Sequence, residues 1–153
     1  MAEPVKRTPV FASVYEHGVD EKRRLQIPSK WRAGTQDMEL MLTVWPNSWQ
    51  KEASIMVYPP EVFEKMVARL AERSFTDPEA DSLRRFIGER SDTATIDRAG
   101  RICLPETMAH AIGLKKESVL VGMLDRFQIW TPEAYKESKI GNDAVAANAW
   151  KQF

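Results

Sequence analysis

Two short segments with acidic and basic residues at matching positions recur in this 153-residue chain. The first reads D-E-K-R-R-L-Q-I-P at 20–28, and the second reads D-R-A-G-R-I-C-L-P at 97–105. In each, an arginine lies four residues after an aspartate and precedes an aliphatic-x-aliphatic-Pro step. A planar guanidinium can bind phosphate oxygens or a guanine edge through two donors, so this residue type is suited to nucleic-acid recognition.

The candidate DNA contacts are the basic residues of these segments: Arg24, Arg101, Lys22, Arg23 and Arg98. Two interpretations stay open for the motif arginines, because each can contact DNA or pair with its aspartate and pin the turn. The cationic neighbours of Arg24 favour DNA there, whereas charges at turn tips are often simply solvated. Asp20 and Asp97 are expected to orient arginines or backbone amides, since a carboxylate near phosphate is repelled. Gly100 is expected to allow a turn with positive φ, and Lys30 and Arg32 are weaker candidates.

Catalytic and metal chemistry find little support in the sequence. His17 and His110 lack a cysteine or histidine partner at metal-ligand spacing, and no P-loop, G-x-S-x-G or Rossmann glycine pattern occurs. The single cysteine, Cys103, alternates with Ile102 and Leu104 and is expected to be a core or interface thiol. We therefore expect no enzyme activity, no cofactor, no metal site and no small-molecule substrate.

Charge and hydropathy place weaker limits on function. The chain has 22 basic and 22 acidic residues, which argues mildly against DNA binding. Residues 1–34 are nevertheless basic by three, so one face can be cationic. One cysteine allows no intrachain disulfide, and neither a signal-peptide pattern nor an apolar stretch of about 18 residues is present. We expect a cytoplasmic protein without a membrane partner.

A second pair of similar segments indicates that the chain is internally repeated. V-Y-P-P-E-V-F at 57–63 matches I-W-T-P-E-A-Y at 129–135, at an offset of 72 rather than 77 residues. The first half therefore carries an insertion of five residues, expected within 46–53 because turn residues are frequent there. The expected organisation is one repeat at 11–76, a second at 77–140, and flexible or docking tails at 1–10 and 141–153.

Each half has the pattern strand, strand, short helix, strand, strand, helix. Alternation before each aspartate and after each motif arginine predicts the first two strands. The later strands are expected at 38–44, 54–58, 118–122 and 127–130, and helices are expected to begin at Pro60, Pro78 and Pro132. A half of about 65 residues buries too little surface to be stable alone, so the halves, or two chains, should share one barrel-like core.

These segments resemble the MraZ family, within the broader group of swapped-hairpin SpoVT/AbrB-like DNA-binding proteins. The resemblance covers about 11–136 and includes both D-x-x-x-R segments, Arg84-Arg85-Phe86, residues 128–133 and Phe11. It implies a mixed α+β fold of tandem duplicated swapped-hairpin units around a β-barrel-like core, with peripheral helices. It also implies a nucleoid-associated bacterial regulator that forms homo-oligomeric rings, binds direct repeats in promoter DNA and represses its own division and cell-wall operon.

The first motif departs from the family pattern at one position. The family has glycine before the motif arginine, as Gly100 precedes Arg101, but Arg23 stands there in the first copy. A residue other than glycine at positive φ costs about 1 kcal/mol, so either the first turn has another shape or the extra cation compensates. The alternative function is an oligomeric scaffold or protein-interaction module that keeps the fold without specific DNA binding.

Overall fold

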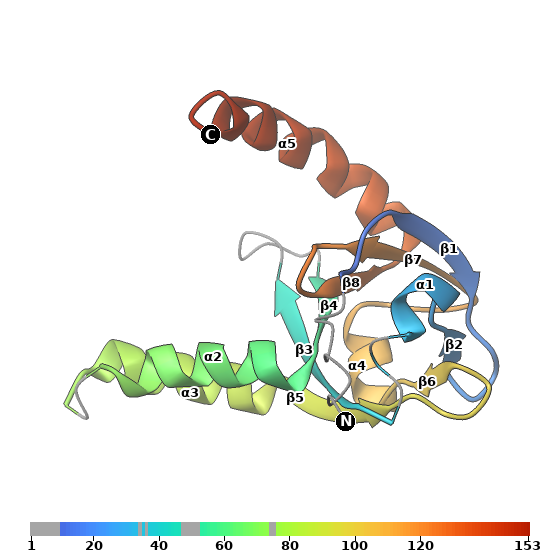
Figure 1. The fold of residues 1–153 in the computed structure, drawn as a ribbon, viewed down its shortest axis with the longest axis horizontal. Helices are drawn as coiled ribbons and strands as arrows, with labels where there is room; N and C mark the ends of the chain where they lie inside the picture. The colour runs from blue at the N-terminus through green and yellow to red at the C-terminus, as the bar shows by residue number, and fades with distance from the viewer. Residues whose placement is uncertain (1–9, 34, 36, 47–52, 74–75) are drawn as a thin grey trace, which may run out of the picture.

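The computed structural model describes residues 10–33, 35, 37–46, 53–73 and 76–153. Within them, six strands form one antiparallel sheet in the order β1-β7-β8-β4-β3-β5 (Figure 1). The strands are β1 (Val14–Gly18), β3 (Glu39–Pro46), β4 (Ala53–Tyr58), β5 (Ser91–Thr95), β7 (Glu117–Gly122) and β8 (Phe127–Trp130). A separate two-stranded ribbon consists of β2 (Arg24–Gln26) and β6 (Arg101–Cys103).

The helices complete the expected order of elements in both halves. They are α1 (Ser29–Arg32), α2 (Pro60–Ala71), α3 (Pro78–Glu89), α4 (Glu106–Ala111) and α5 (Pro132–Trp150). The mixed α+β class is therefore confirmed. The barrel-like core is not confirmed, because in the described part of the chain the sheet is open, with β1 and β5 as its edges. The insertion expected in 46–53 falls mostly outside the described residues, between the paired ends of β3 and β4.

Proline and capping residues explain where the long helices begin. Proline occupies the first turn of α2, α3 and α5, where its missing N–H removes no helical hydrogen bond. Asp77 caps α3 by accepting the backbone N–H groups of Glu79 and Ala80 at 3.0 and 3.3 Å. The α2–α3 pair and α5 extend from the sheet in different directions (Figure 1). None of the helices in the described ranges is long and apolar enough to cross a membrane.

One cluster of buried side chains combines residues from both halves of the chain. It includes Leu40, Leu42, Ile55 and Val57 from β3 and β4, Leu120, Phe127 and Ile129 from β7 and β8, and Leu25 and Ile102 from the ribbon. Trp31 attaches α1 to this core: its ring contacts those of Phe11 and Phe127, and its indole N–H donates to the Ala12 carbonyl at 3.0 Å. The shared core therefore fixes the position of the ribbon and of the short helix beside it.

Candidate nucleic-acid interface

The β2–β6 ribbon brings the two motif arginines onto one outer face. In its register, Arg24 is opposite Cys103, Leu25 opposite Ile102, and Gln26 opposite Arg101. Leu25 and Ile102 are fully buried, so the alternating residues on either side of them face outward. Arg24 and Arg101 are diagonal neighbours on that face, a relation that separates residues by about 7–8 Å in an antiparallel pair.

Hydrogen bonds across the ribbon occur in equivalent pairs, whose residues are related by the same 77-residue offset as the sequence motifs. The Ile27 N–H donates to the Gly100 carbonyl, and the Leu104 N–H donates to the Arg23 carbonyl, both at 2.9 Å. The related side chains also match, since Gln26 Nε2 donates to the Ala99 carbonyl at 3.0 Å and the Cys103 thiol donates to the Lys22 carbonyl at 3.2 Å. The two halves of the ribbon are therefore related by an approximate twofold axis between Leu25 and Ile102.

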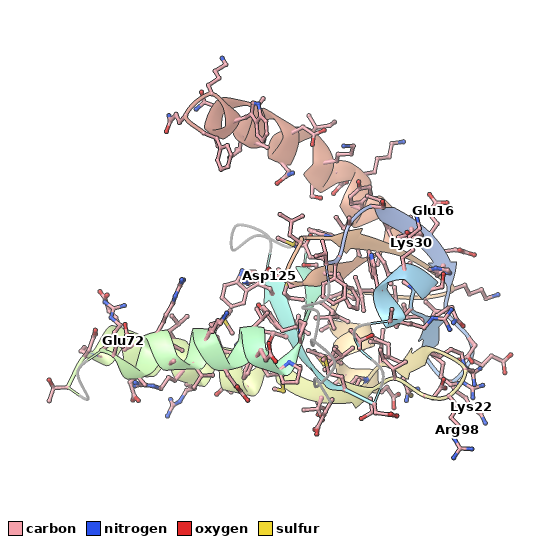
Figure 2. All side chains as sticks on the ribbon, viewed as in Figure 1. Glu16, Lys22, Lys30, Glu72, Arg98 and Asp125 are labelled. Atoms are coloured by element: carbon pink, nitrogen blue, oxygen red, sulfur yellow. The ribbon has the colours of Figure 1, made fainter. Side chains whose placement is uncertain are left out.

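This arrangement places the two turns side by side at one end of the molecule. Figure 2 shows Lys22 and Arg98, one from each turn, projecting from that end, while Lys30 on α1 lies apart from them. Lys22 and Arg98 are exposed. All five predicted DNA contacts therefore belong to one continuous region of ribbon and turns: Arg24, Arg101, Lys22, Arg23 and Arg98.

Each aspartate organises its own turn. Asp20 Oδ1 accepts the backbone N–H groups of Lys22 and Arg24, both at 2.9 Å, and its Oδ2 accepts Arg24 Nε at 2.7 Å. Asp97 accepts the N–H groups of Ala99 and Arg101 in the same way, with Arg101 Nε at 3.3 Å. The backbone N–H of the motif arginine is the main reason why the pKa of each carboxyl lies below its ordinary value. Each carboxylate therefore holds both the backbone of its own turn and the Nε of its motif arginine.

Pairing with aspartate leaves most of each motif guanidinium available. Arg24 and Arg101 contact their aspartates through Nε, and among the described residues their terminal Nη groups have no hydrogen-bond partner. The side chains of Arg24 and Arg101 are 33% and 34% exposed. The two interpretations of these arginines are thus compatible, because the aspartate can aim a guanidinium whose outer edge binds another anion.

The first turn has the same shape as the second although Arg23 replaces glycine. Arg23 has φ +59° and Gly100 has φ +80°. The N–H of Arg23 donates to the Asp20 carbonyl at 3.0 Å, and that of Gly100 donates to the Asp97 carbonyl at 2.9 Å. Arg23 Nε also donates to the Leu104 carbonyl at 3.0 Å, which offsets part of the strain of its left-handed backbone.

For Cys103, the core position that was one of its two predicted environments is wrong, whereas the other, a subunit interface, stays a prediction. Cys103 is exposed on the outer face of the ribbon and does not belong to the core. The period of two along a strand explains this, because Ile102 packs inward and the next residue must point outward. Gln26, on the same face, was not among the candidates, since a lone glutamine has no sequence signal that distinguishes it.

Other candidates are structural or remain apart from the ribbon. Arg84 Nη2 donates to the Leu70 carbonyl at 2.8 Å and so ties α3 to α2. His17 lies in β1 and His110 in α4. In the part of the chain that the structure describes, no group of three or more histidine, cysteine, aspartate or glutamate residues could hold a metal ion.

Comparison with known proteins identifies the family. The family model described as "MraZ protein, putative antitoxin-like" matches residues 10–86 and 89–144. The chain belongs to the MraZ family. Both turns and the ribbon lie within the matched residues, so the MraZ resemblance seen in the two motifs is confirmed.

Relatives with the name Transcriptional regulator MraZ match most of the chain. One from Herpetosiphon aurantiacus is 33% identical over 83% of this chain and 85% of its own length. One from Acidithiobacillus ferrooxidans is 31% identical over 79% of this chain and 82% of its own. A third, from Acetivibrio thermocellus, is 27% identical over 92% and 93%. The similarity thus extends across both halves of the MraZ fold.

Proposed function

We propose that this chain is a transcriptional regulator that binds double-stranded DNA through the outer face of the β2–β6 ribbon and its two turns. The observation that carries the proposal is the pairing of β2 with β6, which puts both motif arginines on one face. The major groove of B-DNA, about 12 Å wide, admits a two-stranded ribbon. The names of the relatives support regulation of transcription as the purpose of this binding.

Within this interface, each type of side chain has a different role. Arg24 and Arg101 lie on the ribbon and contact guanine edges or the adjacent phosphates. Lys22 and Arg98 at the turn tips and Arg23 beside them contact phosphates, which positions the ribbon without reading sequence. Turn 20–24 has three basic and two acidic residues, and turn 97–101 has two basic and one acidic. This small local surplus gives one subunit modest affinity.

Oligomerisation multiplies that affinity. The proposed regulator is a homo-oligomeric ring whose subunits engage successive direct repeats, a linkage that can raise avidity by about 10²–10⁴. Exposed apolar side chains support further contacts between copies. They occur near the sheet edge and turn (Val10, Val14, Met123 and Leu124) and on α5 (Ile140, Val145 and Trp150). A single species with the mass of one chain in light scattering would contradict the ring.

The finer biological assignment belongs to the same proposal. The chain consists of two duplicated swapped-hairpin units, 11–76 and 77–140, which is supported by the matching hydrogen bonds at the 77-residue offset. It acts in the cytoplasm, on the nucleoid, as repressor of its own division and cell-wall operon. The rival scaffold function rested on Arg23, but the left-handed conformation of Arg23 preserves the turn and removes that argument.

Fluorescence anisotropy with the DNA directly upstream of the chain's own gene tests the interface. The wild-type chain, Arg24→Ala and Arg101→Ala are titrated over a salt series, with a scrambled DNA of equal length. Arg69→Ala is the matched control, because Arg69 is an exposed cation on α2, away from the ribbon. All variants lose one positive charge.

The expected result is selective binding with a steep salt dependence. Each ribbon variant should lose about 1–3 kcal/mol of discrimination if its arginine reads a base, or reduce the salt slope by about 1 if it binds a phosphate. Arg69→Ala should bind like wild type. Wild-type binding no tighter than to scrambled DNA would reject the regulator and favour the scaffold.

A further inference from the structure

Arg32 lies against the second turn although it belongs to the short helix of the first half. Gly100 is buried, and a Cβ atom placed on it would be 2.6 Å from Arg32 Cδ and 2.8 Å from Arg32 Cζ. The end of the Arg32 side chain thus occupies the space beside the Gly100 Cα atom. Two features favour glycine there: its positive φ and the room that this arginine takes.

Arg32 has no anion of its own in the described part of the protein. Its Nε is buried and has no hydrogen-bond partner, and no ion pair among the described residues includes it. The carboxylate of the second turn, Asp97, is engaged by Arg101. A buried donor without an acceptor is costly and rare in native proteins. Because Arg32 as a whole is only partly buried, an anion from outside the chain can still approach its side chain.

In the first turn, an arginine and a small residue occupy the two equivalent positions in exchanged order. The 77-residue offset relates Gly100 to Arg23 and Arg32 to Ala109. In the first turn the arginine comes from the turn itself and reaches the Leu104 carbonyl, while the helix position holds alanine. In the second turn the helix provides the arginine and the turn provides the glycine. Each turn therefore has an arginine at one of the two equivalent positions.

We infer that Arg32 is a phosphate-binding residue of the second turn and the counterpart of Arg23 in the first. This inference rests on the proposed function, because the external anion is then a phosphate of the DNA backbone. Each turn contributes three cations to the interface: Lys22, Arg23 and Arg24 in the first, and Arg32, Arg98 and Arg101 in the second. The second motif has one basic residue fewer than the first in the sequence, and Arg32 supplies the missing positive charge from α1.

The salt dependence of DNA binding tests this assignment with three variants. Arg32→Ala removes the guanidinium. Arg32→Ala combined with Gly100→Arg rebuilds the second turn in the form of the first. Lys30→Ala is the control, because Lys30 is an exposed cation on the same helix but lies apart from the turn tips (Figure 2). Arg32→Gln, which removes the charge but keeps a polar side chain, provides a second variant if the alanine variant is not folded by circular dichroism.

Loss of one phosphate contact should reduce the slope of log K against log salt by about 0.9, so the affinity lost between about 50 and 200 mM salt becomes about threefold smaller. This is expected for Arg32→Ala and Arg32→Gln, with recovery in the double variant and a wild-type slope for Lys30→Ala. A wild-type slope for Arg32→Ala, with an altered one for Arg24→Ala, would overturn the inference and leave the proposed function intact. Failure of the double variant to recover would overturn the equivalence with Arg23. Absence of selective binding by the wild type would reject both proposals.

Discussion

Replacing Gly100 with alanine should weaken DNA binding, whereas its effect on the free energy of unfolding should resemble that of an equivalent change at a glycine away from the interface. Gly113 provides the comparison, because both glycines have positive φ, +80° and +68°. A Cβ at Gly113 meets nothing within 4 Å, whereas one at Gly100 meets the side chain of Arg32. Gly113→Ala therefore measures backbone strain alone, and Gly100→Ala adds the displacement of the guanidinium.

The magnitudes follow from these two environments. An alanine held in the left-handed region costs about 1–2 kcal/mol, so both variants should lose that much free energy of unfolding. The atoms next to Gly100 belong to the end of a flexible side chain, which can move away, so the two losses should differ by less than about 1 kcal/mol. The DNA salt slope should fall by about 0.9 for Gly100→Ala alone, the effect of one lost phosphate contact.

Urea denaturation and the anisotropy salt series measure these two quantities on the same protein samples. Equal salt slopes for the two variants would refute the prediction that the Arg32 guanidinium must lie beside Gly100 to bind phosphate. A loss of unfolding free energy in Gly100→Ala that exceeds the control by about 3 kcal/mol would also refute the reasoning, since it would show that Arg32 is held rigidly by the protein.

Three further changes test the packing and the turns. Leu25→Ala should cost about 2–5 kcal/mol in urea denaturation because Leu25 is fully buried, while Cys103→Ala, on the outer face, should stay within about 0.5 kcal/mol; similar losses would contradict the assignment of the ribbon's two faces. Asp77→Ala should cost about 1 kcal/mol in thermal denaturation, because it removes the N-cap of α3, and an unchanged Tm would argue against that cap. Asp20→Asn should weaken the acid dependence of stability. The pKa of Asp20 is lowered by folding, so its contribution is present above the ordinary carboxyl pKa and is lost as pH falls through the lower folded value; an acid titration followed by circular dichroism that matches wild type would exclude this.

The local elements were predictable because each has a strong signal in neighbouring residues. Proline at the start of α2, α3 and α5, and alternation in the apolar strands, depend only on local backbone geometry. The prediction of a barrel-like core went beyond such signals, because it depends on whether the edge strands β1 and β5 approach each other, and no local pattern in these strands decides that.

The candidate site was predictable in composition but not in arrangement. The repeated aspartate and arginine spacing identified both turns, and the positive φ of Gly100 followed from its residue type. The contact between Arg32 and Gly100 joins residues far apart in the chain through packing of Trp31 into the core, which no local pattern encodes. The outward position of Cys103 could have been found, since strand alternation already required it.

The pairing of β1 with β7 also sets the timing of folding during synthesis. Val14 pairs with Val121, so the first strand of the sheet has to wait until a segment about 100 residues further along the chain has left the ribosome. At about 5–20 residues per second, that delay is about 5–20 s. During this interval β1 has no strand partner at its final position in the sheet. Its short length and the presence of Glu16 and His17 are suited to such a delay, because polar residues reduce pairing with other nascent chains.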